Sequence, residues 1–175
     1  MLETNVLEKA KKIRLLISDV DGVLTNGQIY FGPAGETIKA FHIHDGLGIK
    51  LLRQAGIEFA IITAKKTAMV QERFEQLGVK YIFQGCENKF PVVQQLAETL
   101  KISLQEIAYV GDDLPDLLSI KQVGLGIAVP NAVTFVKENA DYQTKCKGGK
   151  GAIREICEFI LSAQEKLTSI YQQYS

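Results

Sequence analysis

The chain of 175 residues has 20 basic and 20 acidic side chains, which cancel, and 46% of its residues are hydrophobic. This composition is typical of a soluble globular protein with a single domain over residues 1–175, and a chain without excess basic charge is not expected to bind nucleic acid. Segment 1–12 is polar, and no apolar run approaches the roughly 20 residues that span a bilayer, so we expect neither a signal peptide nor a membrane partner. Three dispersed cysteines without a CxxC motif favour free thiols and a cytoplasmic location.

Strands and helices are expected to alternate along the chain. The first strand is the apolar run at 13–17, and a β-hairpin at about 27–43 follows because two β-rich runs flank Gly-Pro-Ala-Gly. Asp45 is expected to cap a helix that runs through Gln54. Further strands are predicted at 58–63, 79–83, 107–110 and 125–129, and further helices at 67–77, 91–100, 115–121, 132–140 and from 152 onward. The alternation indicates an α/β fold with a doubly wound parallel sheet.

Two carboxylates, Asp19 and Asp21, follow the first strand and precede Gly22. Ligands of open α/β sheets bind just beyond the carboxyl ends of the strands, so both side chains are expected to face a crevice. Side chains at i and i+2 of an extended chain point the same way, so the two charges would repel and one carboxyl would stay protonated near neutral pH. The pair suits one nucleophile and one proton carrier, although an Asp-rich turn would also explain it.

Three more polar signals fall at predicted strand ends. Thr63 ends the strand at 58–63, Lys89 follows the strand at 79–83, and Gly111-Asp112-Asp113 follows the strand at 107–110, with Asp116 nearby. Clustered carboxylates suit a hard cation such as Mg²⁺, and a lysine there would neutralise a phosphoryl group or an acid. Each signal alone has an ordinary explanation, such as a solvated lysine or an Asx turn. Four signals at successive strand ends predict one site.

These four segments resemble the motifs of the haloacid dehalogenase superfamily of phosphatases, in order and in separation. The resemblance implies that Asp19 attacks phosphorus and that Asp21 donates and then accepts the proton. It implies that Thr63 and Lys89 bind the transferring oxygens, and that Asp19, the backbone carbonyl of Asp21 and Asp112 hold Mg²⁺. Asp113 is expected to support either the water shell of the metal or Lys89.

Over about residues 13–161 the chain resembles a branch of that superfamily that acts on phosphorylated acidic sugars. Only about 40 residues separate Asp21 from Thr63, and the hairpin fills much of this interval, so we expect a hairpin flap and no cap domain. The resemblance implies 3-deoxy-D-manno-octulosonate 8-phosphate as the substrate, within lipopolysaccharide biosynthesis, with a nine-carbon ulosonate 9-phosphate as the alternative. It also implies a homotetramer in which hairpins of neighbouring subunits help to cover the sites.

The same resemblance implies a set of residues that contact the sugar. Relatives usually have Gly-Arg where this chain has Ala64-Lys65, and arginine is common at the positions of Lys50 and His44. Arginine offers a planar fork to a carboxylate, whereas lysine offers a point charge, so these positions leave the exact sugar open. The full set consists of Asp21, His42, Ile43, His44, Asp45, Gly46, Lys50, Lys65, Arg73 and Lys89.

Three rival functions share parts of this pattern. A phosphate-receiver domain would carry its phosphorylated aspartate after a later strand and would lack the Gly-Asp-Asp segment. A phosphotransferase usually needs a cap that excludes water. A non-catalytic oligomeric regulator would not need the complete set of chemical groups that this chain retains.

Overall fold

The computed structural model describes residues 2–174, and its centre is a six-stranded parallel sheet in the order β5-β4-β1-β6-β7-β8. The chain adds strands on one side of β1 and then returns to add β6 on its other side, so the strand order reverses between β1 and β6. Ligands of open α/β sheets bind at such a reversal. The strands are β1 (Leu15–Ser18), β4 (Glu58–Thr63), β5 (Tyr81–Gln84), β6 (Ile107–Gly111), β7 (Leu125–Ala128) and β8 (Tyr142–Gln143).

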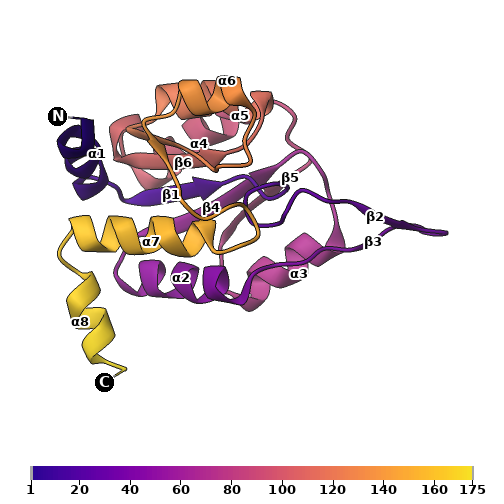
Figure 1. Ribbon diagram of the computed structural model, residues 1–175, viewed down its shortest axis with the longest axis horizontal. Coiled ribbons are helices and arrows are strands. Elements are labelled where there is room, and N and C mark those ends of the chain that lie inside the picture. Colours follow the sequence, from indigo (N-terminus) through magenta and orange to yellow (C-terminus); the bar gives the residue numbers. More distant parts are fainter. Residues whose placement is uncertain (1, 175) are drawn as a thin grey trace.

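Helices cover both faces of the sheet, as expected for a doubly wound fold (Figure 1). One layer contains α4 (Phe90–Leu100), α5 (Leu114–Gln122) and α6 (Thr134–Glu138), and the other contains α2 (Ile43–Gln54), α3 (Ala68–Gln76) and α7 (Ala152–Ala163). Strands β1, β6 and β7 are buried along their whole length, which explains their continuous apolar sequences. The remaining helices are α1 (Leu2–Lys11), α8 (Leu167–Gln172) and the short 3₁₀ helix Leu104–Glu106.

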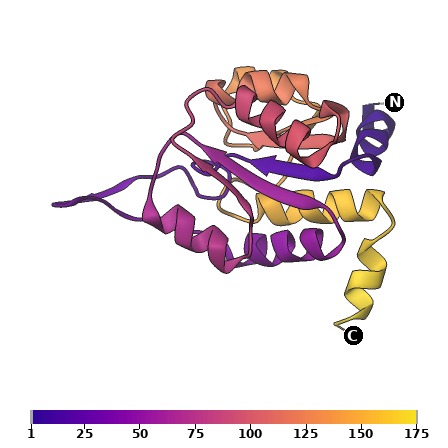
Figure 2. The ribbon, with the colours of Figure 1, turned by 180° about the vertical axis from the view of Figure 1, so that it is seen from behind.

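The hairpin consists of β2 (Tyr30–Gly32) and β3 (Gly35–Ile38), paired antiparallel, and it projects away from the sheet (Figures 1 and 2). Its apolar side chains are exposed, with Phe31 at 76% and Ile38 at 56%. Apart from this hairpin, no separate cap covers the carboxyl edge of the sheet within residues 2–174. The predicted α/β fold with a hairpin flap is confirmed.

Several boundaries differ from the sequence-based expectation. Helix α2 begins at Ile43 with His42 as its N-cap, so the prediction that Asp45 caps it is wrong. The Asp45 carboxylate instead accepts a hydrogen bond from the backbone nitrogen of Arg154 at the start of α7, at 2.8 Å. Helix α6 is shorter than predicted, and α1 and the two-residue β8 were not predicted. The helix expected from 152 onward is interrupted between α7 and α8.

No helix among the described residues is both long enough and apolar enough to cross a membrane. The three cysteines are free thiols, and only Cys157 is buried.

Candidate active site

A cavity of about 330 Å³ opens at the carboxyl edge of the sheet, where the strand order reverses. All four segments singled out from the sequence reach it, because β1, β4 and β6 are neighbours and deliver their following residues to the same edge. Lys89 enters from the start of α4. The lining consists of Asp19, Asp21, Gly27, Thr63, Ala64, Lys65, Lys89, Asp112, Asp113, Pro115 and Asp116.

Lys89 is the buried cation of this cavity. Its ammonium nitrogen lies 2.6 Å from an Asp19 oxygen and 2.7 Å from an Asp116 oxygen, and only 3% of the residue is exposed. Burial and the nearby Asp116 charge raise the pKa of Asp19 to about 7, although the Lys89 ammonium opposes this shift. The like charge that acts on Asp19 is therefore that of Asp116, and the expected repulsion between Asp19 and Asp21 is not what sets its pKa.

Asp116, rather than Asp113, is the carboxylate that supports Lys89. One Asp116 oxygen accepts hydrogen bonds from Lys89 and from the Tyr109 hydroxyl, each at 2.7 Å. Its other oxygen accepts the backbone nitrogens of Asp112 and Asp113, at 3.1 and 3.3 Å. Asp113 is the N-cap of α5, where it accepts the backbone nitrogen of Leu114. The spacing Asp113-x-x-Asp116 is that of a capping box, and it could have indicated from the sequence that Asp113 caps the helix.

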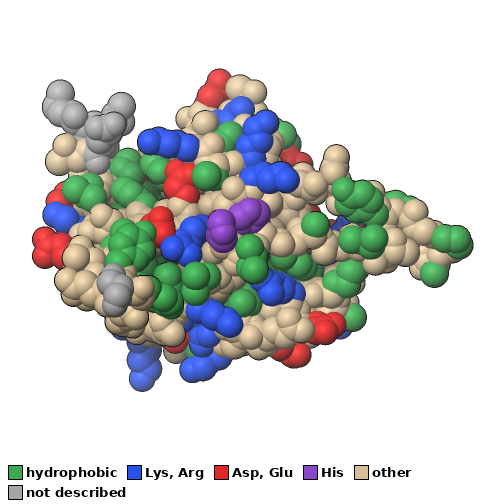
Figure 3. Space-filling model, turned by 60° about the horizontal axis from the view of Figure 1, so that its bottom comes forward, with side chains coloured by type: hydrophobic (Ala, Val, Ile, Leu, Met, Phe, Trp, Pro, Cys, Tyr) green, Lys and Arg blue, Asp and Glu red, His purple; other side chains and the backbone are tan. Residues whose placement is uncertain are grey.

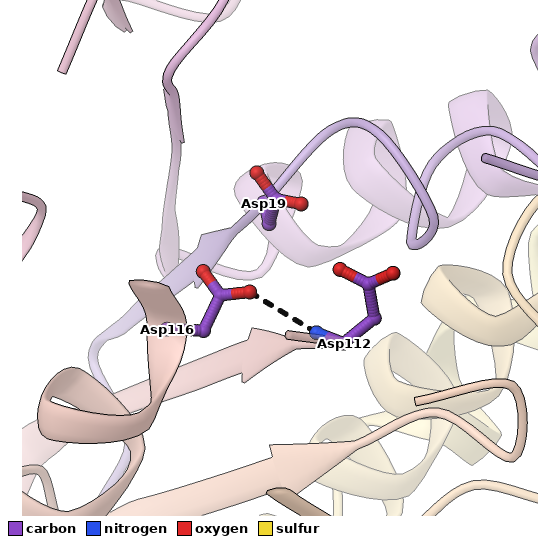
Figure 4. A group of neighbouring side chains, drawn as sticks. All are labelled: Asp19, Asp112 and Asp116. Carbon is purple, nitrogen blue, oxygen red and sulfur yellow. Dashed lines mark hydrogen bonds between the residues drawn. The ribbon is translucent and has the colours of Figure 1, made fainter. Parts of the chain in front are cut away.

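Three carboxylates in this cavity are close enough to share a metal ion. Oxygens of Asp19, Asp112 and Asp116 lie within 4.8 Å of one another (Figure 4). Burial and the charges of the other two raise the pKa of Asp112 to about 8, so negative charge exceeds what Lys89 neutralises. Because both Asp116 oxygens are already hydrogen-bonded, Asp19 and Asp112 are the better ligands. An oxygen-rich site with excess negative charge fits Mg²⁺.

Gly22 brings the loop after β1 against this carboxylate cluster. It has a φ of +95°, and a Cβ atom built there would lie 1.9 Å from an Asp112 oxygen. Only glycine combines this backbone conformation with so close an approach. The glycine that follows the Asp19–Asp21 pair in the sequence is therefore needed for the shape of the site.

Comparisons with known proteins agree with this geometry. A family model of haloacid dehalogenase-like hydrolases matches residues 82–156. A relative from Escherichia coli (strain K12), named 3-deoxy-D-manno-octulosonate 8-phosphate phosphatase KdsC, is 46% identical over 95% of this chain and 88% of its own length. The KdsC relative from Yersinia pestis is 44% identical over 93% of this chain and 87% of its own length. The chain belongs to the haloacid dehalogenase-like hydrolases.

Solved structures of this hydrolase family have the same fold as the chain. A 3-deoxy-D-manno-octulosonate 8-phosphate phosphatase from Moraxella catarrhalis, in complex with magnesium ion, phosphate ion and KDO, has a TM-score of 0.96 at 42% identity, covering 98% of this chain and 99% of its own. A putative hydrolase of the superfamily from Legionella pneumophila has a TM-score of 0.95 at 49% identity, covering 99% of this chain and 95% of its own.

Within one chain, the hydrolase cavity holds only some of the residues predicted to bind substrate. Asp21, Lys65 and Lys89 line it, with Lys65 in the loop after β4. The others surround the start of α2, where Ile43, Gly46, Lys50 and Arg73 border one hollow and His42 and His44 border another. Figure 3 shows the two histidines among lysine and arginine side chains on that face. Asp45 is buried beside α7 and does not line the catalytic cavity.

Proposed function

We propose that this protein is a Mg²⁺-dependent phosphatase that hydrolyses 3-deoxy-D-manno-octulosonate 8-phosphate to the free sugar acid and phosphate, a step of lipopolysaccharide biosynthesis. The observation that carries the proposal is the buried Asp19–Lys89–Asp116 cluster beside Asp112, in a chain 46% identical to named phosphatases of this substrate. The cluster supplies a nucleophile, a cation for the phosphoryl group and carboxylates for a metal ion.

Asp19 is the proposed nucleophile. It attacks phosphorus, and the bond between phosphorus and the sugar oxygen breaks to give an aspartyl-phosphate and an alkoxide. Lys89 holds one Asp19 oxygen at 2.6 Å, which leaves the other for the attack. In the second step a water attacks the aspartyl-phosphate at phosphorus, so that phosphate leaves and the Asp19 carboxylate is restored.

Asp21 is the proposed proton carrier. It gives its proton to the leaving alkoxide in the first step and takes one from the attacking water in the second. It lines the same cavity as Asp19 and comes from the turn that follows β1. One residue thus serves both steps, because the sugar leaves from the side at which the water enters.

Thr63 and Lys89 are proposed to bind the oxygens that move with phosphorus. Thr63 is buried at the end of β4, and the Lys89 ammonium reaches the cavity between two carboxylates. Asp19, Asp112 and the backbone carbonyl of Asp21 would hold Mg²⁺, which when bound shields the anionic phosphoryl group from the anionic nucleophile. Electrostatic positioning of this kind carries most of the catalysis of phosphoryl transfer.

The remaining residues predicted to contact the substrate do not line the cavity of Asp19 in their own chain. Lys65 lies at the open side of the cavity, with 42% of its side chain exposed and a Glu36 oxygen at 3.4 Å, and we propose that it meets the sugar acid there. We propose that the cluster around His42–Gly46, Lys50 and Arg73 contributes across a subunit interface of a homotetramer. The exposed apolar side chains of the hairpin support burial against a neighbouring subunit. Free thiols and the nature of the substrate favour the cytoplasm as its location.

Phosphate release from a panel of sugar phosphates tests the proposal. The panel contains the octulosonate 8-phosphate, a nonulosonate 9-phosphate and neutral hexose phosphates, each with Mg²⁺ and with EDTA. We expect strong preference for the octulosonate, no turnover in EDTA or with Asp19→Asn, and unchanged turnover with Glu98→Gln, which makes the same acid-to-amide change on the exposed side of α4. Preference for the nonulosonate would refute the substrate, and no turnover of any compound would favour a non-catalytic regulator.

A further inference from the structure

The side chain of Lys39 is buried at the base of an otherwise exposed hairpin, although the residue as a whole is half-buried. Only 1% of its side chain is exposed, whereas Ile38 beside it is 56% exposed. Its ammonium donates a hydrogen bond to Oδ1 of Asp21 and lies 2.9 Å from Oε1 of Glu36. Removing a charged ammonium from water is costly unless paired groups compensate, so the two carboxylates are what keep Lys39 in this position.

The Lys39 contact determines how the Asp21 carboxylate is held. Asp21 lies in a turn beyond the end of β1, so its backbone is not held in the strand ladder. Within residues 2–174, Lys39 is the hydrogen-bond partner of its carboxylate. Because Lys39 binds Oδ1, it leaves Oδ2 of Asp21 for a proton in transit.

Glu36 connects the same ion pair to the substrate side of the cavity. Its Oε1 faces Lys39 at 2.9 Å, and its Oε2 lies 3.4 Å from the Lys65 ammonium. Only 13% of the Glu36 side chain is exposed, so solvent competes weakly for these contacts. Asp21, Lys39, Glu36 and Lys65 therefore form a row of alternating charge that runs from the cavity, through the base of the hairpin, and back to the cavity.

We propose that Lys39 is a positioning residue for Asp21, held in place by Glu36. The proposal rests on the function proposed above, in which Asp21 transfers the proton. Lys39 touches neither substrate nor phosphorus; it fixes Oδ1 of Asp21 so that Oδ2 meets the leaving oxygen in the first step and the water in the second. A misplacement of about 1 Å in such a group costs about 100-fold in rate.

Two substrates with different leaving groups distinguish a positioning role of Lys39 from a general structural role. A sugar alkoxide is a poor leaving group and needs the proton from Asp21, whereas p-nitrophenolate leaves without one. Loss of proton positioning therefore slows cleavage of the sugar phosphate and spares cleavage of p-nitrophenyl phosphate. A distorted cavity or a displaced hairpin slows both substrates alike.

The experiment measures alcohol release with enzyme in excess, because this reports the first step alone. With Lys39→Met we expect the rate of sugar release to fall about 10- to 100-fold, and that of p-nitrophenolate release to change less than about 3-fold. Asp21→Asn should give the same pattern with a larger loss, and Lys39→Arg should restore part of the rate. Lys9→Met is the matched control, since it removes another ion-paired lysine, bound to Asp141 on the surface.

Each alternative outcome has a definite meaning. Equal losses with both substrates, or no loss with either, would overturn the positioning role. If Lys39→Met fails to fold, Glu36→Gln keeps the lysine, weakens its support and should show a smaller loss with the same dependence on the leaving group. Wild-type protein that does not cleave the octulosonate phosphate would refute the proposed substrate alone; the comparison would then use whichever alkyl phosphate of the panel is cleaved.

Discussion

The substitution Asp112→Asn is expected to make the metal-free protein more stable while it removes a metal ligand. Asp112 faces the charges of Asp19, Asp116 and Asp113, and burial with these charges raises its pKa from 3.8 to about 8. Within residues 2–174, the side-chain oxygens of Asp112 accept no hydrogen bond, so replacing this carboxylate by an amide breaks none. The carboxylate is therefore a source of repulsion that only a cation relieves.

The size of the stability gain of Asp112→Asn, and its dependence on pH, follow from the raised pKa of Asp112. The unfolded chain loses this proton near pH 4 and the folded protein near pH 8, so the free energy of unfolding falls as pH rises between these values. A shift of this size corresponds to about 6 kcal/mol for a fully buried group. Because the Asp112 side chain is partly open to the cavity, solvent screening reduces the effect, and we expect a gain of about 2 kcal/mol for Asp112→Asn at pH 8. Near pH 4 the gain should vanish.

Urea unfolding in EDTA at pH 4.5 and pH 8 measures this gain, with Glu98→Gln as the acid-to-amide control. Added Mg²⁺ should raise the urea midpoint of the wild-type protein at pH 8 and leave that of Asp112→Asn nearly unchanged, because binding to the folded state alone stabilises it. A variant that is less stable than the wild type at pH 8 in EDTA would show that the carboxylate is not under repulsion, and the reasoning would fail.

Three further substitutions test other parts of the site. Lys89→Met leaves Asp116 and its neighbours without their buried cation. We expect the free energy of unfolding in urea at pH 8 to fall by about 3 kcal/mol and the rate of phosphate release to fall at least about 100-fold. A variant as stable as the wild type would contradict this. Gly22→Ala places a methyl group on Asp112, so calorimetry should detect no Mg²⁺ binding, and retained binding would refute the close approach. Phe31→Ser on the hairpin should lower the molar mass in light scattering from that of the proposed tetramer toward that of a monomer, and an unchanged mass would exclude the hairpin from the interface.

The sequence predicted the parts of the site that depend on strand ends. Asp19, Thr63 and Asp112 each follow an apolar run that is buried in the structure, and a parallel sheet delivers such positions to one edge. The hairpin was also predictable, because glycine and proline between two β-rich runs allow few other structures. The two-residue β8 is too short to show an apolar period, whereas α1 carries Val6 and Ala10 at helical spacing and could have been predicted.

The partners of the catalytic groups could not be predicted in the same way. Asp116 and Asp113 are both acidic and three residues apart, and only the start of α5 decides that Asp113 caps the helix while Asp116 turns toward Lys89. Lys39 likewise reads as a solvated hairpin lysine until its ion pair with Asp21 is seen.

The sequence by itself determined the fold class and the edge of the sheet at which the chemistry lies, because apolar periodicity and strand-end residues are local properties of the chain. The family was indicated by the resemblance of its four motifs. The tertiary structure decided which carboxylate faces which cation, and which carboxyls have raised pKa values, because these depend on distances between segments remote in the sequence. Lys89 and Asp19 are 70 residues apart, yet their charged atoms lie 2.6 Å from each other. Burial and the charge of Asp116 raise the pKa of the proposed nucleophile, whereas the contact with Lys89 opposes this shift.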